Sequence, residues 1–175
     1  PRLRVLDDEE YERLLKACKE VDLIYLENAF VFSIETCVRQ GELLNARWEN
    51  VNFKKQTLFI PDTKTGYLSK ESTSERTIPL SKLAIITLNK LPRHISGRIF
   101  PITRDQLNQK WKLAKKKAKI KNYRYHDNRS TGISWCFEKK NLNVAEVMTI
   151  SGHRSPTILL KRYTKLNPTK IAMKI

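Results

Sequence analysis

The residues best suited to chemistry lie in the last third of the chain, over residues 125–165. Two histidines, His126 and His153, stand there with Arg129 and Tyr163 in a strongly basic setting. Arginine binds phosphate oxygens through a planar fork of donors, and nearby arginines favour the phenolate form of a tyrosine. We therefore expect Tyr163 to be a nucleophile that attacks a phosphate held by the other three residues.

The charge of the chain is concentrated in the same part of the sequence. Of the net charge of +16, residues 1–100 contribute +2 (16 Lys/Arg against 14 Asp/Glu) and residues 101–175 contribute +14 (18 against 4). A one-sided positive field attracts polyanions, so this asymmetry indicates a nucleic-acid partner. The alternative is a lysine-rich surface that serves only solubility.

Length and composition favour one globular domain, with 175 residues of which 40% are hydrophobic. The three cysteines, Cys18, Cys37 and Cys136, form no CxxC pair and are odd in number, which favours a reducing cytoplasm and buried thiols. No apolar run approaches the roughly eighteen residues needed to span a bilayer. The chain begins Pro1-Arg2 without an initiator methionine, so we expect a fragment.

Caps and apolar spacing predict the elements that must position the candidate residues. The fold class expected is mainly α-helical with a small antiparallel β-sheet (α+β), because only residues 51–80 show a period of two. The predicted strands are 57–60 and 76–79, with Lys64 near the loop tip between them. The predicted helices are 7–20, 23–38, 42–44, 81–91, 103–119, 126–140, 143–150 and 156–163, with a short amphipathic tail over 169–175.

The helix predicted from Thr103 carries lysines around most of its circumference, so part of it must face solvent or phosphate. Because it comes just before the chemical segment, we expect some of these side chains to contact DNA, although a solvated helix face would look the same. The candidate DNA-binding residues are Lys110, Lys112, Lys115, Lys116, Lys117, Lys119, Lys121 and Arg124.

Five motifs stand in order along the chain: Arg39-Gln40-Gly41-Glu42-Leu43-Leu44 with Trp48, Thr63-Lys64-Thr65-Gly66 followed by Arg76-Thr77-Ile78-Pro79-Leu80, His126-Asp127-Asn128-Arg129, Ser151-Gly152-His153 and Arg162-Tyr163-Thr164. Taken together, these motifs resemble the tyrosine recombinases, a family that includes phage integrases and the recombinases that resolve chromosome dimers. The resemblance extends from about Asp7 to Lys174 and covers the family's catalytic domain. It implies that residues 1–175 are that domain and that an N-terminal core-binding (clamp) domain is absent from this fragment.

The resemblance also implies a reaction at the DNA backbone that needs neither a metal, nor another cofactor, nor ATP. Tyr163 would form a 3′-phosphotyrosyl bond, and Lys64 would be the general acid that protonates the departing 5′ oxygen. A 5′ hydroxyl of a second strand could then reverse the step on a new partner, so the product would be recombined DNA.

The other matched residues would prepare the phosphate for attack. Arg39 and Arg129 would clamp the scissile phosphate, and His126 and His153 would be further donors or proton carriers. Glu42 resembles the family's acid beside the first arginine and would orient Arg39 rather than react.

Two differences from the family pattern bear on geometry. Cys37-Val38 replaces a Thr-Gly pair that is common before the first arginine, a difference expected to matter little if the backbone there needs no positive φ. Tyr163 lies ten positions after His153, one more than the family spacing, which predicts a displaced helix or a looser connection. The rival tyrosines Tyr123 and Tyr125 precede the first histidine, so we expect them to pack or to contact DNA.

The resemblance implies a cytoplasmic protein of a phage or other mobile element whose partner is a double-stranded recombination site. It implies a monomer without DNA and a tetramer on DNA, assembled through the C-terminal tail Thr169 to Ile175. Two other functions remain open from the sequence: a type IB topoisomerase-like relaxase with the same chemistry, and a DNA-binding module whose catalytic residues are vestigial.

Overall fold

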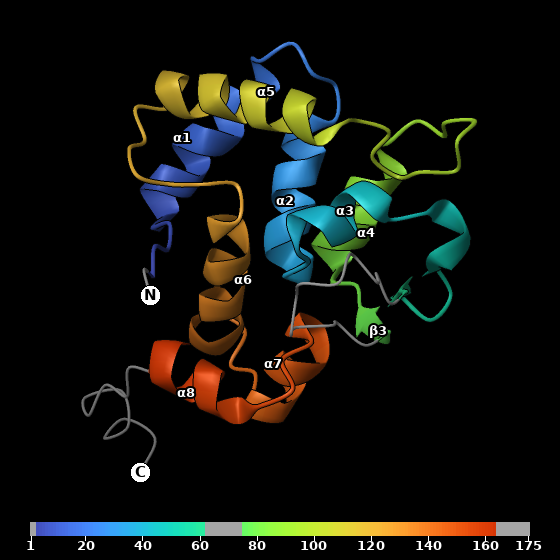
Figure 1. Cartoon of the computed structure of the whole chain (residues 1–175), viewed down its shortest axis with the longest axis vertical. Helices are drawn as coiled ribbons and strands as arrows, with labels where there is room; N and C mark the ends of the chain where they lie inside the picture. Colours follow the sequence, from blue (N-terminus) through green and yellow to red (C-terminus); the bar gives the residue numbers. More distant parts are fainter. Residues whose placement is uncertain (1–2, 62–74, 164–175) are drawn as a thin grey trace, which may run out of the picture.

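The computed structural model describes residues 3–61 and 75–163, which form one mainly helical body with a small sheet (Figure 1). The helices are α1 (Asp8–Lys19), α2 (Leu26–Thr36), α3 (Gln40–Asn45), the 3-10 helix η1 (Trp48–Asn50), α4 (Lys82–Asn89), α5 (Arg104–Lys117), α6 (Asp127–Glu138), α7 (Val144–Ser151) and α8 (Pro156–Tyr163). In Figure 1, α2 and α6 lie near the centre, α1 and α5 lie at one end of the long axis, and α7 and α8 lie at the other end. No helix in this described part is long and apolar enough to cross a membrane.

Side-chain caps start several helices where the sequence predicts them. Asp7, Thr103 and Asn143 each accept a hydrogen bond from the third residue of their helix, and Glu10, Gln106 and Glu146 at those positions bond back to the caps. A capping box of this kind satisfies two N–H groups that the helix leaves without partners. The predicted starts of α1, α5 and α7 are therefore confirmed.

The strands are β1 (Val51–Asn52), β2 (Thr57–Ile60) and β3 (Arg76–Pro79), which pair antiparallel in the order β1-β2-β3. Both predicted strands are confirmed, and β1 adds a third that was not predicted. The register places Leu58 opposite Ile78, both fully buried, so one face of the sheet is apolar. The mainly α fold class with a small antiparallel sheet is correct.

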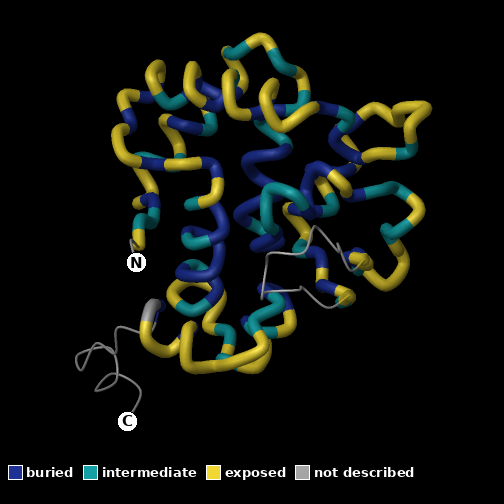
Figure 2. Tube along the Cα trace, in the orientation of Figure 1, coloured by how far each residue is buried: buried dark blue, intermediate teal, exposed yellow. Residues whose placement is uncertain are grey.

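Two hydrophobic clusters hold the described elements together. In Figure 2 the traces of α2 and α6 are mostly dark blue, because most of their residues are buried. The larger cluster surrounds α2 and includes Phe30, Phe32, Phe100, Trp111 and Tyr123, each at most 3% exposed. The smaller one joins α6, α7 and α8 and consists of Cys37, Ile133, Cys136, Val147, Ile150, Leu159 and Tyr163. Each large side chain buried in this way contributes about 1.5–3 kcal/mol of transfer free energy.

The central pair, α2 and α6, comes unusually close at Gly132. A Cβ atom at that position would lie 2.2 Å from the main-chain oxygen of Ile34 and 2.9 Å from the sulfur of Cys37. Only glycine fits there, so Gly132 fixes the approach of α6 to the end of α2. This approach carries the first turn of α6, with Arg129, toward the segment that precedes Arg39.

The predicted helix boundaries differ from the observed ones by up to two residues, except at the start of the second helix, where the prediction is wrong by three. The second helix begins at Leu26 rather than at residue 23, because Val21 to Leu26 form turns in which Leu23 N–H bonds to Val21 O and Leu26 N–H bonds to Leu23 O. Apolar spacing alone does not separate such a turn from the first turn of a helix.

Candidate active site

The guanidinium of Arg129 joins three of the sequence motifs. The side chain is buried on α6, and it donates to the main-chain oxygens of Cys37 at 2.5 Å and of Ser151 at 2.6 Å. Cys37 precedes Arg39 by two positions and Ser151 precedes His153 by two positions. Segments that lie far apart in the sequence are therefore held against the same arginine.

The backbone at Cys37 has a φ of 53°, so the condition under which the Cys37-Val38 difference would matter little is not met. This left-handed residue ends α2 and lets the chain enter α3 at Gln40. A non-glycine residue adopts this conformation only at a cost, which the surrounding packing must offset. Cys37 is fully buried against α6 and α8, where that packing is provided.

Arg39 is the N-cap of α3, and its position depends on Glu42 one turn later. The main-chain N–H of Arg39 donates to Oε2 of Glu42 at 2.8 Å, and its Nη1 donates to Oε1 at 3.2 Å. The predicted contact of Glu42 with Arg39 is present. The same carboxylate also binds Arg76 of β3, whose Nη1 and Nη2 donate at 2.8 and 2.9 Å.

The electrostatics show that the positive groups of the site lie close together. Burial, followed by the charge of Arg39, lowers the pKa of Arg129 to about 10. The pKa of His126 is also lowered, first by partial desolvation and then by Arg129, with a smaller effect of Arg39. Burial raises the pKa of Glu42, but its hydrogen bonds and charge interactions with Arg76 and Arg39 outweigh this, so the pKa is lower than normal. Such a concentration of positive charge suits an anion.

The two histidines lie at helix ends, as predicted. His126 is the N-cap residue of α6 and retains solvent access. Gly152, with a φ of 71°, ends α7, and His153 follows it. The Nδ1 of His153 lies 2.7 Å from the hydroxyl of Ser151, which restrains the ring.

Tyr163 packs inward from α8 rather than standing free. Its side chain belongs to the smaller hydrophobic cluster, and its hydroxyl lies 3.3 Å from that of Ser130, the residue after Arg129. The extra residue between His153 and Tyr163 does not prevent this docking. The phenol therefore lies beside the first turns of α6 in the protein alone.

The rival tyrosines pack in the core. Tyr123 bonds to Asn128 and Thr131, and Tyr125 bonds to Ser33 and to the main-chain oxygen of Ala29. Burial raises the pKa of both phenols well above the usual value. Neither is suited to attack, and the expectation that they pack is confirmed.

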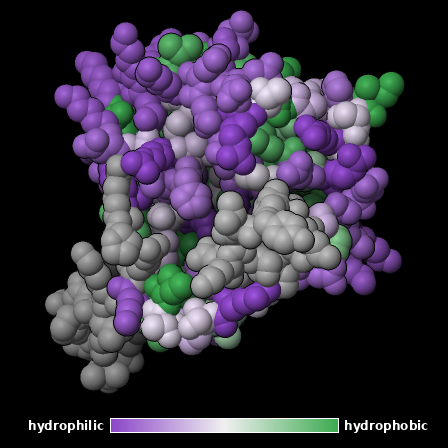
Figure 3. Space-filling model, viewed as in Figure 1, coloured by the Kyte–Doolittle hydropathy of each residue, from purple (hydrophilic) through white to green (hydrophobic). Residues whose placement is uncertain are grey.

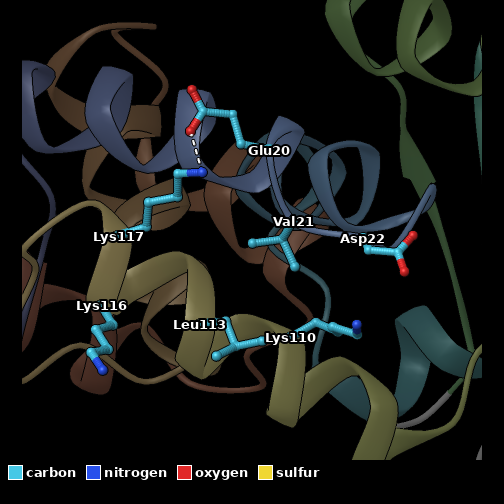
Figure 4. Close-up of a pocket in the computed structure, with 7 residues that line it drawn as sticks. All are labelled: Glu20, Val21, Asp22, Lys110, Leu113, Lys116 and Lys117. Carbon is cyan, nitrogen blue, oxygen red and sulfur yellow. Dashed lines mark ion pairs between the residues drawn. The ribbon is translucent and has the colours of Figure 1, made fainter.

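The predicted DNA-binding lysines lie on or just after α5. Lys112, Lys116, Lys117, Lys119, Lys121 and Arg124 are exposed, whereas Lys110 and Lys115 are half-buried. The face seen in Figure 3 is largely hydrophilic in this region. Lys117 is paired with Glu20 at 2.7 Å, beside a shallow hollow between α5 and the end of α1 that Lys110 and Lys116 also line (Figure 4). Among the described residues, none of the motif residues lines this hollow, so it is separate from the candidate active site.

Some predicted residues lie outside the described part of the chain. These are Lys64, within residues 62–74, and the tail from residue 164 to 175. Within residues 3–61 and 75–163, no group of three or more His, Cys, Asp or Glu side chains is placed to hold a metal ion. One residue of the site was missed: Arg76 shares the face of β3 with buried Ile78, and the alternation of strand side chains could have revealed it.

The sequence matches the model of the phage integrase family over residues 4–170. The shufflon-specific DNA recombinase of Escherichia coli is 35% identical over 99% of this chain and 43% of its own length. A putative integrase/recombinase of Haemophilus influenzae is 30% identical over 98% of this chain and 56% of its own length. The chain thus spans about half the length of these curated relatives.

Solved structures show the same fold. The catalytic domain of bacteriophage HP1 integrase has a TM-score of 0.72 at 20% identity, and the match covers 98% of this chain and 95% of the integrase chain. The Tn1549 transposon integrase in complex with circular intermediate DNA has a TM-score of 0.76 at 16% identity, covering 99% of this chain and 65% of its own. With the match to the family model, these likenesses establish that the chain belongs to the phage integrase family of tyrosine recombinases.

Proposed function

We propose that this chain is the catalytic domain of a site-specific DNA recombinase that breaks and rejoins strands through a covalent bond to Tyr163. The observation that carries the proposal is the pair of hydrogen bonds from Arg129 to Cys37 and Ser151, which gathers the motifs of Arg39, His126 and His153 around one cationic site. The relatives support it, since one is a shufflon-specific DNA recombinase and one neighbouring structure contains a transposon's circular intermediate DNA.

The proposed reaction exchanges one phosphodiester bond for another. The phenolic oxygen of Tyr163 attacks the phosphorus, the bond from phosphorus to the 5′ oxygen breaks, and a 3′-phosphotyrosyl bond forms. Lys64 donates the proton that the 5′ oxygen takes up as it leaves. Attack by a 5′ hydroxyl of another strand reverses these steps and frees the tyrosine, so neither ATP nor a metal is consumed.

Arg39 and Arg129 neutralise the charge that grows on the non-bridging oxygens during the attack. Because its pKa is lowered, His126 is largely uncharged at neutral pH and can accept the phenolic proton or donate to the phosphate. His153, restrained by Ser151, is the second such group.

We further propose that DNA lies along the basic residues of α5 and against the cationic site. Assembly of four subunits on two duplexes would use the tail, Thr169 to Ile175. A clamp domain joined before residue 1 would complete the grip on the duplex.

A trapping experiment tests the proposal and identifies the target site at the same time. The chain is incubated with a library of nicked duplexes of random sequence, in which the cleaved fragment diffuses away and rejoining fails. Adducts that survive denaturation are recovered and their DNA is sequenced. The proposal predicts a defined sequence attached to the wild-type protein and no adduct with Tyr163→Phe.

The two other functions give different results. A vestigial DNA-binding module would bind duplexes but trap none, and this result would contradict the proposal. A relaxase would form the adduct, yet two plasmids carrying the recovered site would yield only relaxed circles. The recombinase instead yields joined segments from both plasmids.

A further inference from the structure

Arg76 of β3 is a buried arginine with a fixed geometry. Its side chain is 10% exposed, and both terminal nitrogens bind the two oxygens of Glu42, at 2.8 and 2.9 Å. Its strand position is set by the pairing of Arg76 with Ile60 in β2. The fork of the guanidinium thus fixes both the place and the plane of the Glu42 carboxylate.

That carboxylate is also the support of Arg39. Both of its oxygens accept hydrogen bonds from both arginines. Oε2 accepts from the main-chain N–H of Arg39 and from Nη2 of Arg76, and Oε1 accepts from Nη1 of each arginine. The side-chain bond from Arg39 is the longest of the four, at 3.2 Å, and the Arg39 side chain is 29% exposed. Arg76 therefore takes the strong bidentate contact, while Arg39 keeps only one side-chain contact to Glu42 and faces outward.

Arg76 also runs directly beneath the turn that carries His153. A Cβ atom on Gly152 would lie 2.7 Å from Nε of Arg76 and 2.9 Å from its Cδ and Cζ. In the described part of the chain this Nε is buried without a hydrogen-bond partner. An unpaired buried donor is unfavourable, so the place of this side chain costs stability that its two hydrogen bonds to Glu42 must offset.

We infer that Arg76 is a positioning residue of the recombination reaction: through Glu42 it holds Arg39 in the orientation that binds the scissile phosphate, and it packs against the Gly152 turn. The inference rests on the proposed function. Without Arg76, the Glu42 carboxylate is free to form the full bidentate pair with Arg39. That pair neutralises Arg39 and draws it away from the phosphate.

The experiment separates this role from a purely structural ion pair by changing the charge of the phosphate. Arg76→Gln and Arg76→Lys are compared with wild type on duplexes carrying the site recovered with the random library. Each duplex has either a normal phosphate or a neutral methylphosphonate at the scissile position. The measured quantity is the rate of adduct formation relative to wild type on the same duplex.

On the normal phosphate, Arg76→Gln should reduce the rate about 100-fold, because a displaced Arg39 no longer holds the reacting atoms in place. On the methylphosphonate, which has no charge for Arg39 to neutralise, the same variant should lie within about tenfold of wild type. On the normal phosphate, the rate of Arg76→Lys should lie between the rates of wild type and Arg76→Gln, because lysine keeps the charge but lacks the planar fork of donors.

The matched control is Arg4→Gln. Arg4 lies outside the site, and its two terminal nitrogens donate to the carboxylate of Glu10 in the same way. This variant should melt at a lower temperature and react at the wild-type rate on both duplexes. An equal defect of the Arg76 variants on both duplexes, or no defect, would overturn the inference. Arg76→Lys keeps the test valid if Arg76→Gln does not fold, and failure of the wild type to form any adduct would instead overturn the proposed function.

Discussion

Arg129 donates a hydrogen bond to the main-chain oxygen of Cys37, 2.5 Å away and 92 positions earlier in the chain. This contact ties the first turn of α6 to the left-handed end of α2, and a second bond ties it to the end of α7. A residue expected to bind phosphate thus also links three segments of the fold through its hydrogen bonds.

Arg129→Gln should therefore lower stability as well as activity. Two buried main-chain oxygens lose a charged donor, which should reduce the free energy of unfolding by about 2–4 kcal/mol in denaturant titrations. Arg13→Gln is the control, since Arg13 also donates to a main-chain oxygen, that of Ala118 at 3.3 Å, but from the surface. Its effect should stay below about 0.5 kcal/mol. Equal effects of the two variants would show that Arg129 is not a structural link.

Gly152→Ala should impair both folding and reaction. The positive φ of 71° costs an alanine about 1–2 kcal/mol, and the new methyl group would displace Arg76. Gly97→Ala is a close control, because Gly97 has a φ of 72° and its Cβ would meet the side chain of Arg47, in a loop outside the site. Both variants should lose similar stability in thermal melts, but only Gly152→Ala should slow adduct formation. Equal rates for the two would contradict the role inferred for Arg76 in the reaction.

The ion pairs of Glu42 should make stability depend on pH in the acid range. Because the pKa of Glu42 is lower in the folded protein, its contribution is fully present above its unfolded pKa of about 4.5. This contribution is lost as the pH falls through the folded pKa. The difference in unfolding free energy between wild type and Glu42→Gln, measured from pH 7 down to pH 3, should therefore shrink below about pH 4.5. A difference that stays constant over this range would contradict a depressed pKa.

How far the sequence predicts this protein depends on whether the signal is local. A helix cap is recognised from a few neighbouring residues, so the caps Asp7, Thr103 and Asn143 correctly predicted where three helices begin. The bond between Arg129 and Cys37 is not predictable in this way, because it depends on the close crossing of two helices at Gly132.

The site shows the same division. The order of the motifs identified Arg39, His126, Arg129 and His153 as candidates, and the described structure brings their segments together. The role of Arg76 was missed because its partner, Glu42, lies 34 positions away in the sequence. Its place on the buried face of β3 could nevertheless have been predicted from the alternation of side chains along the strand. The positive φ of Cys37 stayed an open question, because no local residue type signals it.

The lysines of α5 should differ in their contribution to DNA binding. Lys112 and Lys116 are exposed, and neutralising either should weaken binding to a random duplex and reduce its salt slope by about one. Lys117→Gln should have a smaller effect, because Lys117 is already paired with Glu20. Fluorescence anisotropy at several salt concentrations measures the slopes. Unchanged slopes for Lys112→Gln and Lys116→Gln would remove α5 from the DNA interface.

The most direct measurement of the central claim is the chemical identity of the bond between protein and DNA. Trapped wild-type adducts are digested with protease and nuclease, and the modified peptide is sequenced by mass spectrometry. We predict a nucleotide joined through its 3′ phosphate to Tyr163, and a free 5′ hydroxyl on the other side of the break. Attachment to any other residue, or through a 5′ phosphate, would contradict the account.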